Sequence, residues 1–175
     1  MRFRISDFGF RIYLLWASVV CTATSTAAEP QAEFKLETIR GRVVFLAEAL
    51  EKRLGVPSVP EAKQRVLALE TASGELIPLV EDVRGRAFRR DERLRKAEIE
   101  LLVRRYEGSP VVQIIRVFEV AQDGRYELDY WCDICAIAMY ELKDCECCQG
   151  PIELRRTKAE EEGLGARAAN SRAGD

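Results

Sequence analysis

Five cysteines are the residues of this 175-residue chain whose type and spacing point most directly to chemistry. They are Cys132, Cys135, Cys145, Cys147 and Cys148, within "CDICAIAMYELKDCECC". The first two form one C-x-x-C pair, and Cys145 forms a second pair with Cys148. Two such pairs on neighbouring loops can present four thiolates tetrahedrally to one metal ion. We therefore predict a metal site made of these two pairs, with Cys147 as an additional ligand or a free thiol.

The chain contains no histidine, which excludes a mixed Cys/His metal site. Coordination by sulfur alone suits zinc or a single iron ion, and we expect zinc, with iron or no metal as alternatives. Four protein sulfurs leave no open position for a substrate, so this metal would be structural. Without histidine, Ser-His-Asp, Cys-His and H-E-x-x-H catalysis are also excluded. A carboxylate-based hydrolase is not excluded, but no motif points to one, and we expect a non-enzymatic protein.

Two other interpretations of the cysteines stay open. In the first, two disulfide bonds staple the segment and one cysteine is left over, as is common in exported proteins. In the second, Cys132 attacks and Cys135 resolves in thiol-disulfide exchange. Redox motifs of this kind normally open a helix, whereas C-D-I-C follows a strand-like run, and Asp133 would oppose thiolate formation.

Residues 1–28 have the pattern of a secretory signal peptide. Basic residues precede the apolar run "IYLLWASVVC", and the small polar stretch "TATSTAA" ends at a predicted cleavage site after Ala28. The run is about half of the roughly 20 residues that cross a bilayer, so we expect no membrane span in the mature chain. Cys21 would be discarded with the signal peptide. We expect export to the periplasm or the extracellular space.

Cleavage after Ala28 would make the chain more acidic. It removes Arg2, Arg4, Arg11 and Asp7 from the 27 basic and 29 acidic side chains, leaving a formal net charge of about −4. Nucleic-acid binding relies on Lys and Arg to neutralise phosphates, so we do not expect nucleic acid as a partner. An unknown protein or small ligand is the expected partner.

The elements that must position the cysteines are mostly short strands. Proline cannot donate to a ladder, so Pro78 places its strand at an edge or a bulge. Asp123-Gly124 predicts a hairpin between the runs that flank it. For the start of the domain, a single helix over 43–54 is the alternative to a strand at 41–47 followed by a short helix. The predicted strands are 41–47, 65–71, 75–81, 98–106, 111–120, 125–131 and 152–156, with a short helix ending near Leu54 and a helical connector over 84–98.

This order of elements resembles the oligonucleotide/oligosaccharide-binding (OB) fold, a small Greek-key barrel in which a helix bridges the third and fourth strands. The resemblance covers about residues 39–131, and a generic small β-barrel or α+β domain would give similar runs. We expect a mainly β protein with an OB-like barrel over 39–131. A cysteine-rich segment over 132–156 would pack on it, and 157–175 would be a disordered tail.

The sequence contains two further candidate binding surfaces. Trp131 has the opposite strand parity from Tyr130 and could stack on a base or a sugar, although aromatic residues at strand spacing are more often core. The connector could form an anion-binding face, or its charges could pair locally with Asp91, Glu92 and Glu98. The basic residues of this face are Arg86, Arg89, Arg90 and Arg93.

The stretch "DYWCDICAIAMYELKDCECCQGPIELR", with "PLVEDVRGRAF" upstream, resembles a set of exported bacterial proteins of unknown activity with the same cysteine-rich ending. This resemblance covers most of the mature chain and implies export and a shared cysteine site, with no activity attached. We therefore expect an exported, non-enzymatic binding or interaction module with a Cys-ligated zinc. The alternatives are a thiol-disulfide protein and a disulfide-stapled domain.

Overall fold

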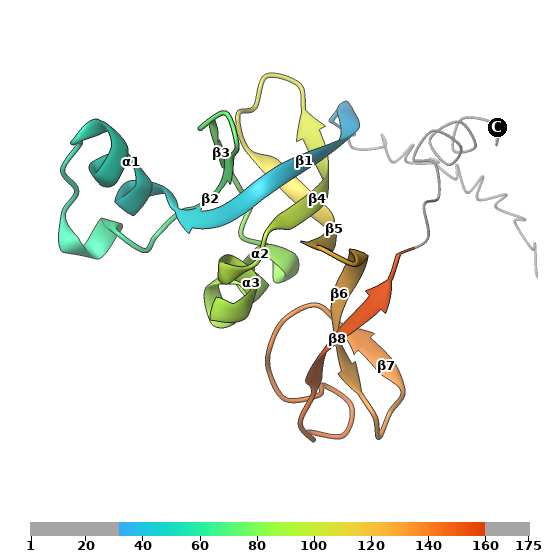
Figure 1. Ribbon diagram of the computed structural model, residues 1–175. Helices are drawn as coiled ribbons and strands as arrows, with labels where there is room; N and C mark the ends of the chain where they lie inside the picture. The colour runs from blue at the N-terminus through green and yellow to red at the C-terminus, as the bar shows by residue number, and fades with distance from the viewer. Residues whose placement is uncertain (1–31, 160–175) are drawn as a thin grey trace, which may run out of the picture. The chain divides into compact units, whose positions relative to one another are not determined.

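The computed structural model describes residues 32–159, so the predicted signal peptide, Cys21 and most of the predicted tail lie outside the described residues. Strands dominate the described part, which confirms the mainly β class. Its first half contains β1 (Phe34–Phe45), α1 (Leu46–Leu54), the 3₁₀ turn η1 (Pro60–Ala62), β2 (Leu67–Thr71), β3 (Leu76–Pro78), α2 (Val83–Arg90) and α3 (Glu92–Lys96). Its second half contains β4 (Ile99–Tyr106), β5 (Val112–Ala121), β6 (Gly124–Cys132), β7 (Ile137–Met139) and β8 (Glu153–Lys158) (Figure 1).

The strands form one antiparallel sheet in the order β3-β2-β1-β4-β5-β6-β7, with β8 also paired with β6. β3 lies at the end of this order and contains Pro78, as predicted for a strand with a proline. No ladder closes the sheet within residues 32–159. A single parallel bridge joins Leu79 to Val112, and the N–H of Val80 donates to the carbonyl oxygen of Val112 at 2.9 Å. Closure into a Greek-key barrel therefore stays a prediction.

β1 changes its neighbour along its length. Its first part pairs with β4 and its last part with β2, and Gly41 belongs to both ladders. A Cβ atom at Gly41 would lie 2.1 Å from the carbonyl oxygen of Glu70, so the close approach of β2 requires glycine. The strand begins earlier than the predicted start at 41. Phe34 and Leu36 are 46% and 47% exposed, so pairing with β4, rather than burial, holds this end of β1 in the sheet.

The helices lie close to their predicted positions. α1 follows β1 directly, which agrees with a strand and a helix and not with a single helix over 43–54. The connector predicted at 84–98 is divided into α2 and α3 at Asp91, whose carboxylate accepts the backbone N–H of Arg93 at 3.0 Å. Asp82 caps α2 in the same way, with two N–H groups of the first turn. Each carboxylate satisfies donors that have no partner inside their helix.

The five strands predicted between residues 65 and 131 are observed as β2 to β6. The hairpin predicted from Asp123-Gly124 is confirmed, with Ala121 paired with Gly124 across the turn. The last predicted strand is β8, which continues to Lys158 and so includes the first two residues of the predicted tail. β7 was not predicted, because it is only three residues long and follows the first C-x-x-C pair without a separate turn signal.

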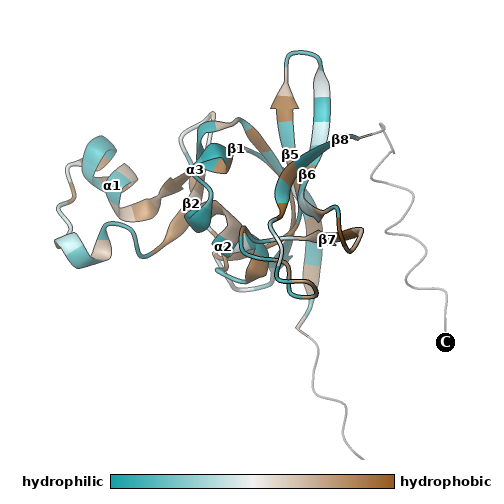
Figure 2. Cartoon of the chain, turned by 90° about the horizontal axis from the view of Figure 1, so that it is seen from below, coloured by the Kyte–Doolittle hydropathy of each residue, from teal (hydrophilic) through white to brown (hydrophobic). Residues whose placement is uncertain are grey.

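One apolar core connects the sheet, α2, α3 and the cysteine-rich segment. Phe88 and Leu94, the apolar residues of the connector, are 0% and 3% exposed and belong to this core. Cys132 and Cys145 belong to the same cluster. Figure 2 shows that β8 is largely hydrophilic, whereas the strands that carry the core contain hydrophobic residues. Among the described residues, the helices are too short or too polar to cross a membrane.

Candidate metal centre

β6 brings the two C-x-x-C turns together, because it has a partner strand on each edge. Tyr130 pairs with Met139 of β7 on one edge and with Leu154 of β8 on the other. Cys132 is the last residue of β6, so the first C-x-x-C pair forms the turn between β6 and β7. The second pair comes shortly before β8, which returns along β6 beside the first turn (Figure 1). Two turns that are separate in sequence thus meet at the end of one strand.

The two C-x-x-C turns have the same backbone structure. The N–H of Ala136 donates to the carbonyl oxygen of Cys132 at 2.8 Å, and the N–H of Gln149 donates to that of Cys145 at 2.9 Å. Ala136 and Gln149, each directly after the second cysteine of its pair, have φ angles of 53° and 58°. The left-handed conformation is uncommon for residues other than glycine, so its occurrence at equivalent positions marks two copies of one turn. We refer to these turns as the first and second knuckle.

The two knuckles direct four sulfurs to one place. The Sγ atoms of the four predicted ligands all lie within 4.8 Å of one another. The Sγ atoms of Cys132 and Cys148 are 3.5 Å apart. Four thiolates around zinc at about 2.3 Å are separated by about 3.8 Å, whereas bonded disulfide sulfurs are about 2.05 Å apart. The cysteines of the described residues are all free thiols. This arrangement fits a metal ion and does not contain the disulfide bonds of the alternative interpretation.

The electrostatic environment distinguishes the individual thiols. The backbone N–H groups of Cys148 and Cys147 lower the pKa of Cys145 to about 7. The N–H of Cys135 also lowers the pKa of Cys132, but burial and the neighbouring thiols raise it more. The thiols of Cys147 and then Cys148 raise the pKa of Cys135. Once Cys145 has ionised, its charge opposes the ionisation of Cys135, and a divalent cation among the sulfurs would reverse this effect.

Cys147 lies outside the four-sulfur group. It occupies the third position of the second knuckle, which corresponds to Ile134 in the first. Ile134 is 72% exposed, and Cys147 is exposed as well. Because the first and fourth residues of each knuckle supply the converging sulfurs, the third residue is left on the outside of the turn. The equivalence of the two knuckles explains why Cys147 is not one of the four converging ligands.

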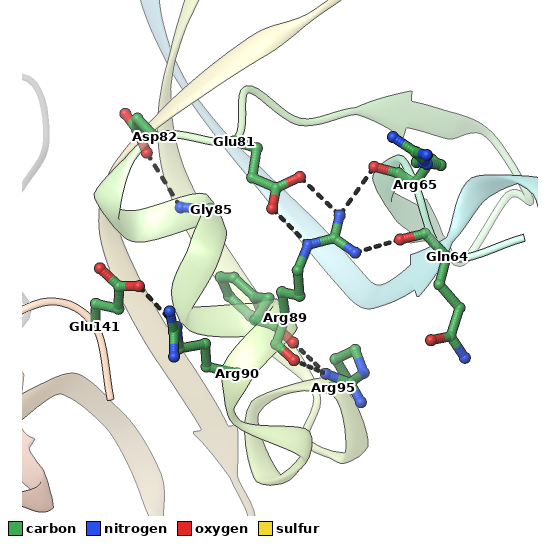
Figure 3. Close-up of polar contacts among 10 residues, drawn as sticks. Gln64, Arg65, Glu81, Asp82, Gly85, Arg89, Arg90, Arg95 and Glu141 are labelled. Carbon is green, nitrogen blue, oxygen red and sulfur yellow. Dashed lines mark hydrogen bonds and ion pairs between the residues drawn. The ribbon is translucent and has the colours of Figure 1, made fainter. Parts of the chain in front are cut away.

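A buried carboxylate fixes the loop between the knuckles to α2. Glu141 is 2% exposed, and its oxygens form ion pairs with Arg86 Nη2 at 3.0 Å and with Arg90 Nε at 2.9 Å. Figure 3 shows the pair with Arg90. Lys143 Nζ is 3.9 Å away. Sequence reasoning missed this residue, although a lone acidic residue after "AIAMY" is a weak signal for a buried pair. These ion pairs attach the loop that follows β7 to α2.

The predicted anion-binding face consists of arginines that have partners within the protein. Arg86 and Arg90 bind Glu141, and Arg93 binds Asp91 at 2.7 Å. Arg89 donates to the carboxylate of Glu81 and to the backbone carbonyl oxygens of Gln64 and Arg65 (Figure 3). These contacts favour the alternative of local pairing, with Glu81 and Glu141 as partners that were not predicted. Binding of an anion here stays a prediction.

Trp131 lies beside the site but is partly covered. The guanidinium carbon of Arg155 is 3.9 Å from the centre of the Trp131 ring, and Arg155 also donates to both carboxylate oxygens of Asp129. A ligand that stacks on this face of the ring would have to displace Arg155.

A small hollow lies between α2, β5 and β6. Its volume is about 20 Å³, room for little more than one water molecule. The residues that line it include Arg84, Arg116, Leu128, Tyr130 and Tyr140. The hollow is too small to hold a small-molecule ligand.

Comparison of the chain with protein-family models, with curated proteins and with solved structures found no match. The assignment of the site therefore rests on its own geometry.

Proposed function

We propose that this chain is an exported, non-enzymatic binding or interaction module whose OB-like β domain carries a structural zinc ion held by Cys132, Cys135, Cys145 and Cys148. The observation that carries the proposal is the pair of equivalent knuckles, whose four sulfurs converge within 4.8 Å. A coincidental group of cysteines would not be expected to repeat the same left-handed residue and the same backbone hydrogen bond.

A structural role follows from how the ligands are connected. Cys132 and Cys145 are 0% exposed and belong to the apolar core. The two knuckles are not joined to each other by a ladder, since β7 and β8 each pair with β6. A bound ion would therefore supply the direct link between them. Zinc fits this role because it accepts four thiolates in a closed tetrahedron, and its binding free energy contributes to folding.

The pairing of the first five strands supports the OB-like part of the proposal. β1 pairs with both β2 and β4, and the parallel bridge from Leu79 to Val112 links the end of β3 to the start of β5. In OB folds the loop between the first two strands borders the binding surface. Here that loop exposes Leu54 and Val59, which are 68% and 64% exposed. Exposed apolar side chains in this position support a protein partner.

Metal content tests the proposal directly. The purified chain is expected to bind one zinc ion, seen in native mass spectrometry as about 65 Da that a chelator removes. Cys132→Ser and Cys145→Ser should lose the ion, whereas Cys147→Ser, the matched control, should keep it. Metal-free protein that remains folded with its thiols oxidised would contradict the proposal. Iron in place of zinc would be visible in the same mass spectrum and by its colour.

A further inference from the structure

The five cysteines differ in how well solvent reaches them. Cys132 and Cys145 are 0% exposed, Cys135 and Cys148 are half-buried, and Cys147 is exposed. The four-sulfur group therefore has a closed side toward the core and an open side toward solvent. Cys147 lies on the open side, as the outer residue of the second knuckle. A dissolved oxidant would reach this sulfur first.

The geometry selects one partner sulfur for Cys147. Cys148 is its neighbour in sequence, and adjacent Cα atoms are about 3.8 Å apart, less than the 4.4 Å or more that a disulfide normally requires. Cys132 and Cys145 are buried. Cys135 belongs to the other knuckle and is partly accessible, and its Sγ atom lies within 4.8 Å of that of Cys148, the residue next to Cys147. A disulfide from Cys147 to Cys135 would thus join the two knuckles.

We propose that Cys147 is an oxidation site and that Cys135 and Cys147 form a disulfide when a peroxide reaches the cluster, which removes one of the four metal ligands. The Cys147 thiolate attacks one peroxide oxygen, the O–O bond breaks, and the products are a sulfenic acid and hydroxide. The Cys135 thiolate then attacks the Cys147 sulfur, the S–S bond forms, and a second hydroxide leaves. Two electrons pass from the two sulfurs to the peroxide.

The consequence for the metal rests on the proposed zinc site. Cys135 in a disulfide no longer offers a thiolate, so three protein ligands remain and the affinity for zinc falls. The fifth cysteine would then make a structural site sensitive to oxidants. Reduction of the disulfide by a thiol restores the four ligands.

The test uses the zinc-loaded full chain treated with hydrogen peroxide at a low molar excess. A chromogenic zinc dye follows release, and peptide mapping of the alkylated product identifies the bridge. We expect release together with a Cys135–Cys147 disulfide and a mass loss of about 2 Da. Cys147→Ser is expected to hold the same amount of zinc and to release it about tenfold more slowly. Reduction with a dithiol and added zinc should reload the wild type.

Equal release rates for the wild type and Cys147→Ser would overturn the proposal, as would a map that shows Cys132–Cys135 or another bridge. The map also separates this proposal from the proposed function. If the purified chain holds no zinc, the metal assignment fails, and the bridge that peroxide forms in the metal-free chain decides the role of Cys147. A Cys135–Cys147 bridge there supports the oxidation site, and its absence overturns it.

Discussion

The contact between Glu141 and α2 leads to a prediction whose size can be worked out from the structure. Replacing both Arg86 and Arg90 with alanine would leave the buried carboxylate of Glu141 with Lys143, 3.9 Å away, as its remaining described cation partner. A buried charge without its partner is destabilising because it has lost water and gained no compensating contact. The loop between the knuckles should then dock less firmly on α2.

The expected cost is moderate because the arginines are not buried. Removing one partner of a buried pair costs about 3–5 kcal/mol. The side chains of Arg86 and Arg90 are 47% and 58% exposed, so solvent already screens part of their interaction with Glu141. We therefore expect a loss of about 2 kcal/mol from the double variant, after this discount. For a domain of this size it corresponds to a fall of about 6 °C in Tm.

Thermal denaturation of the zinc-loaded chain measures this loss. Arg40→Ala is the matched control, because the Arg40–Glu98 pair has both side chains more than half exposed and should cost less than about 0.5 kcal/mol. Adding Glu141→Gln to the double variant keeps the side-chain size, removes the unpaired charge and should recover part of the stability. The reasoning is refuted if the double variant has the same Tm as the Arg40→Ala control, or if adding Glu141→Gln lowers the Tm of the double variant further.

Three further predictions concern stability and export. Gly41→Ala should lower the free energy of unfolding by about 2 kcal/mol or more, because the added Cβ would lie 2.1 Å from the backbone oxygen of Glu70. The control, Gly55→Ala, has nothing within 4 Å of the added Cβ and should cost about 1 kcal/mol because Gly55 has a positive φ. Equal urea midpoints for the two variants would contradict this prediction. The hydrogen bond from Arg89 lowers the pKa of Glu81 from its ordinary value of 4.5. The pair therefore contributes its full stabilisation above pH 4.5, and this stabilisation is lost as the pH falls through the lowered pKa of Glu81. Arg89→Gln should flatten the dependence of stability on pH below 4.5, measured by urea unfolding with chelator present throughout; an unchanged slope would argue against the pair. If the signal peptide is cut after Ala28, the protein recovered after export should begin at Glu29, which N-terminal sequencing tests.

The sequence was most informative where local chemistry decides structure. Asp123-Gly124 predicted a hairpin because glycine permits the turn, and the hairpin is observed between β5 and β6. Pro78 predicted an edge strand for a similar reason. The two C-x-x-C pairs predicted a four-sulfur group, and the four Sγ atoms lie together as expected. In each case the signal lies within a few neighbouring residues.

The features that were missed depend on partners distant in sequence. The first half of β1 is in the sheet because β4 pairs with it, and its exposed Phe34 and Leu36 gave no clear periodic signal. Glu141 became buried because α2 supplies two guanidinium groups. For the connector's arginines we expected either an anion-binding face or local pairing with Asp91, Glu92 and Glu98. The partners that were missed, Glu81 and Glu141, lie outside the connector and could not be seen from its own spacing. Long-range pairing was thus the main source of error.

β6 pairs with three other strands, and this limits how the protein can be shortened or recombined. Its N-terminal part pairs with β5, while its C-terminal part is flanked by β7 and β8 and ends at Cys132. A truncation after β6 would leave both edges of that part without a neighbour and would uncover the buried Tyr130. Open strand edges beside an apolar surface promote aggregation between copies. The cysteine-rich end is therefore not a detachable cassette, and grafts or deletions should keep β6 and everything to the end of β8 as one inseparable unit.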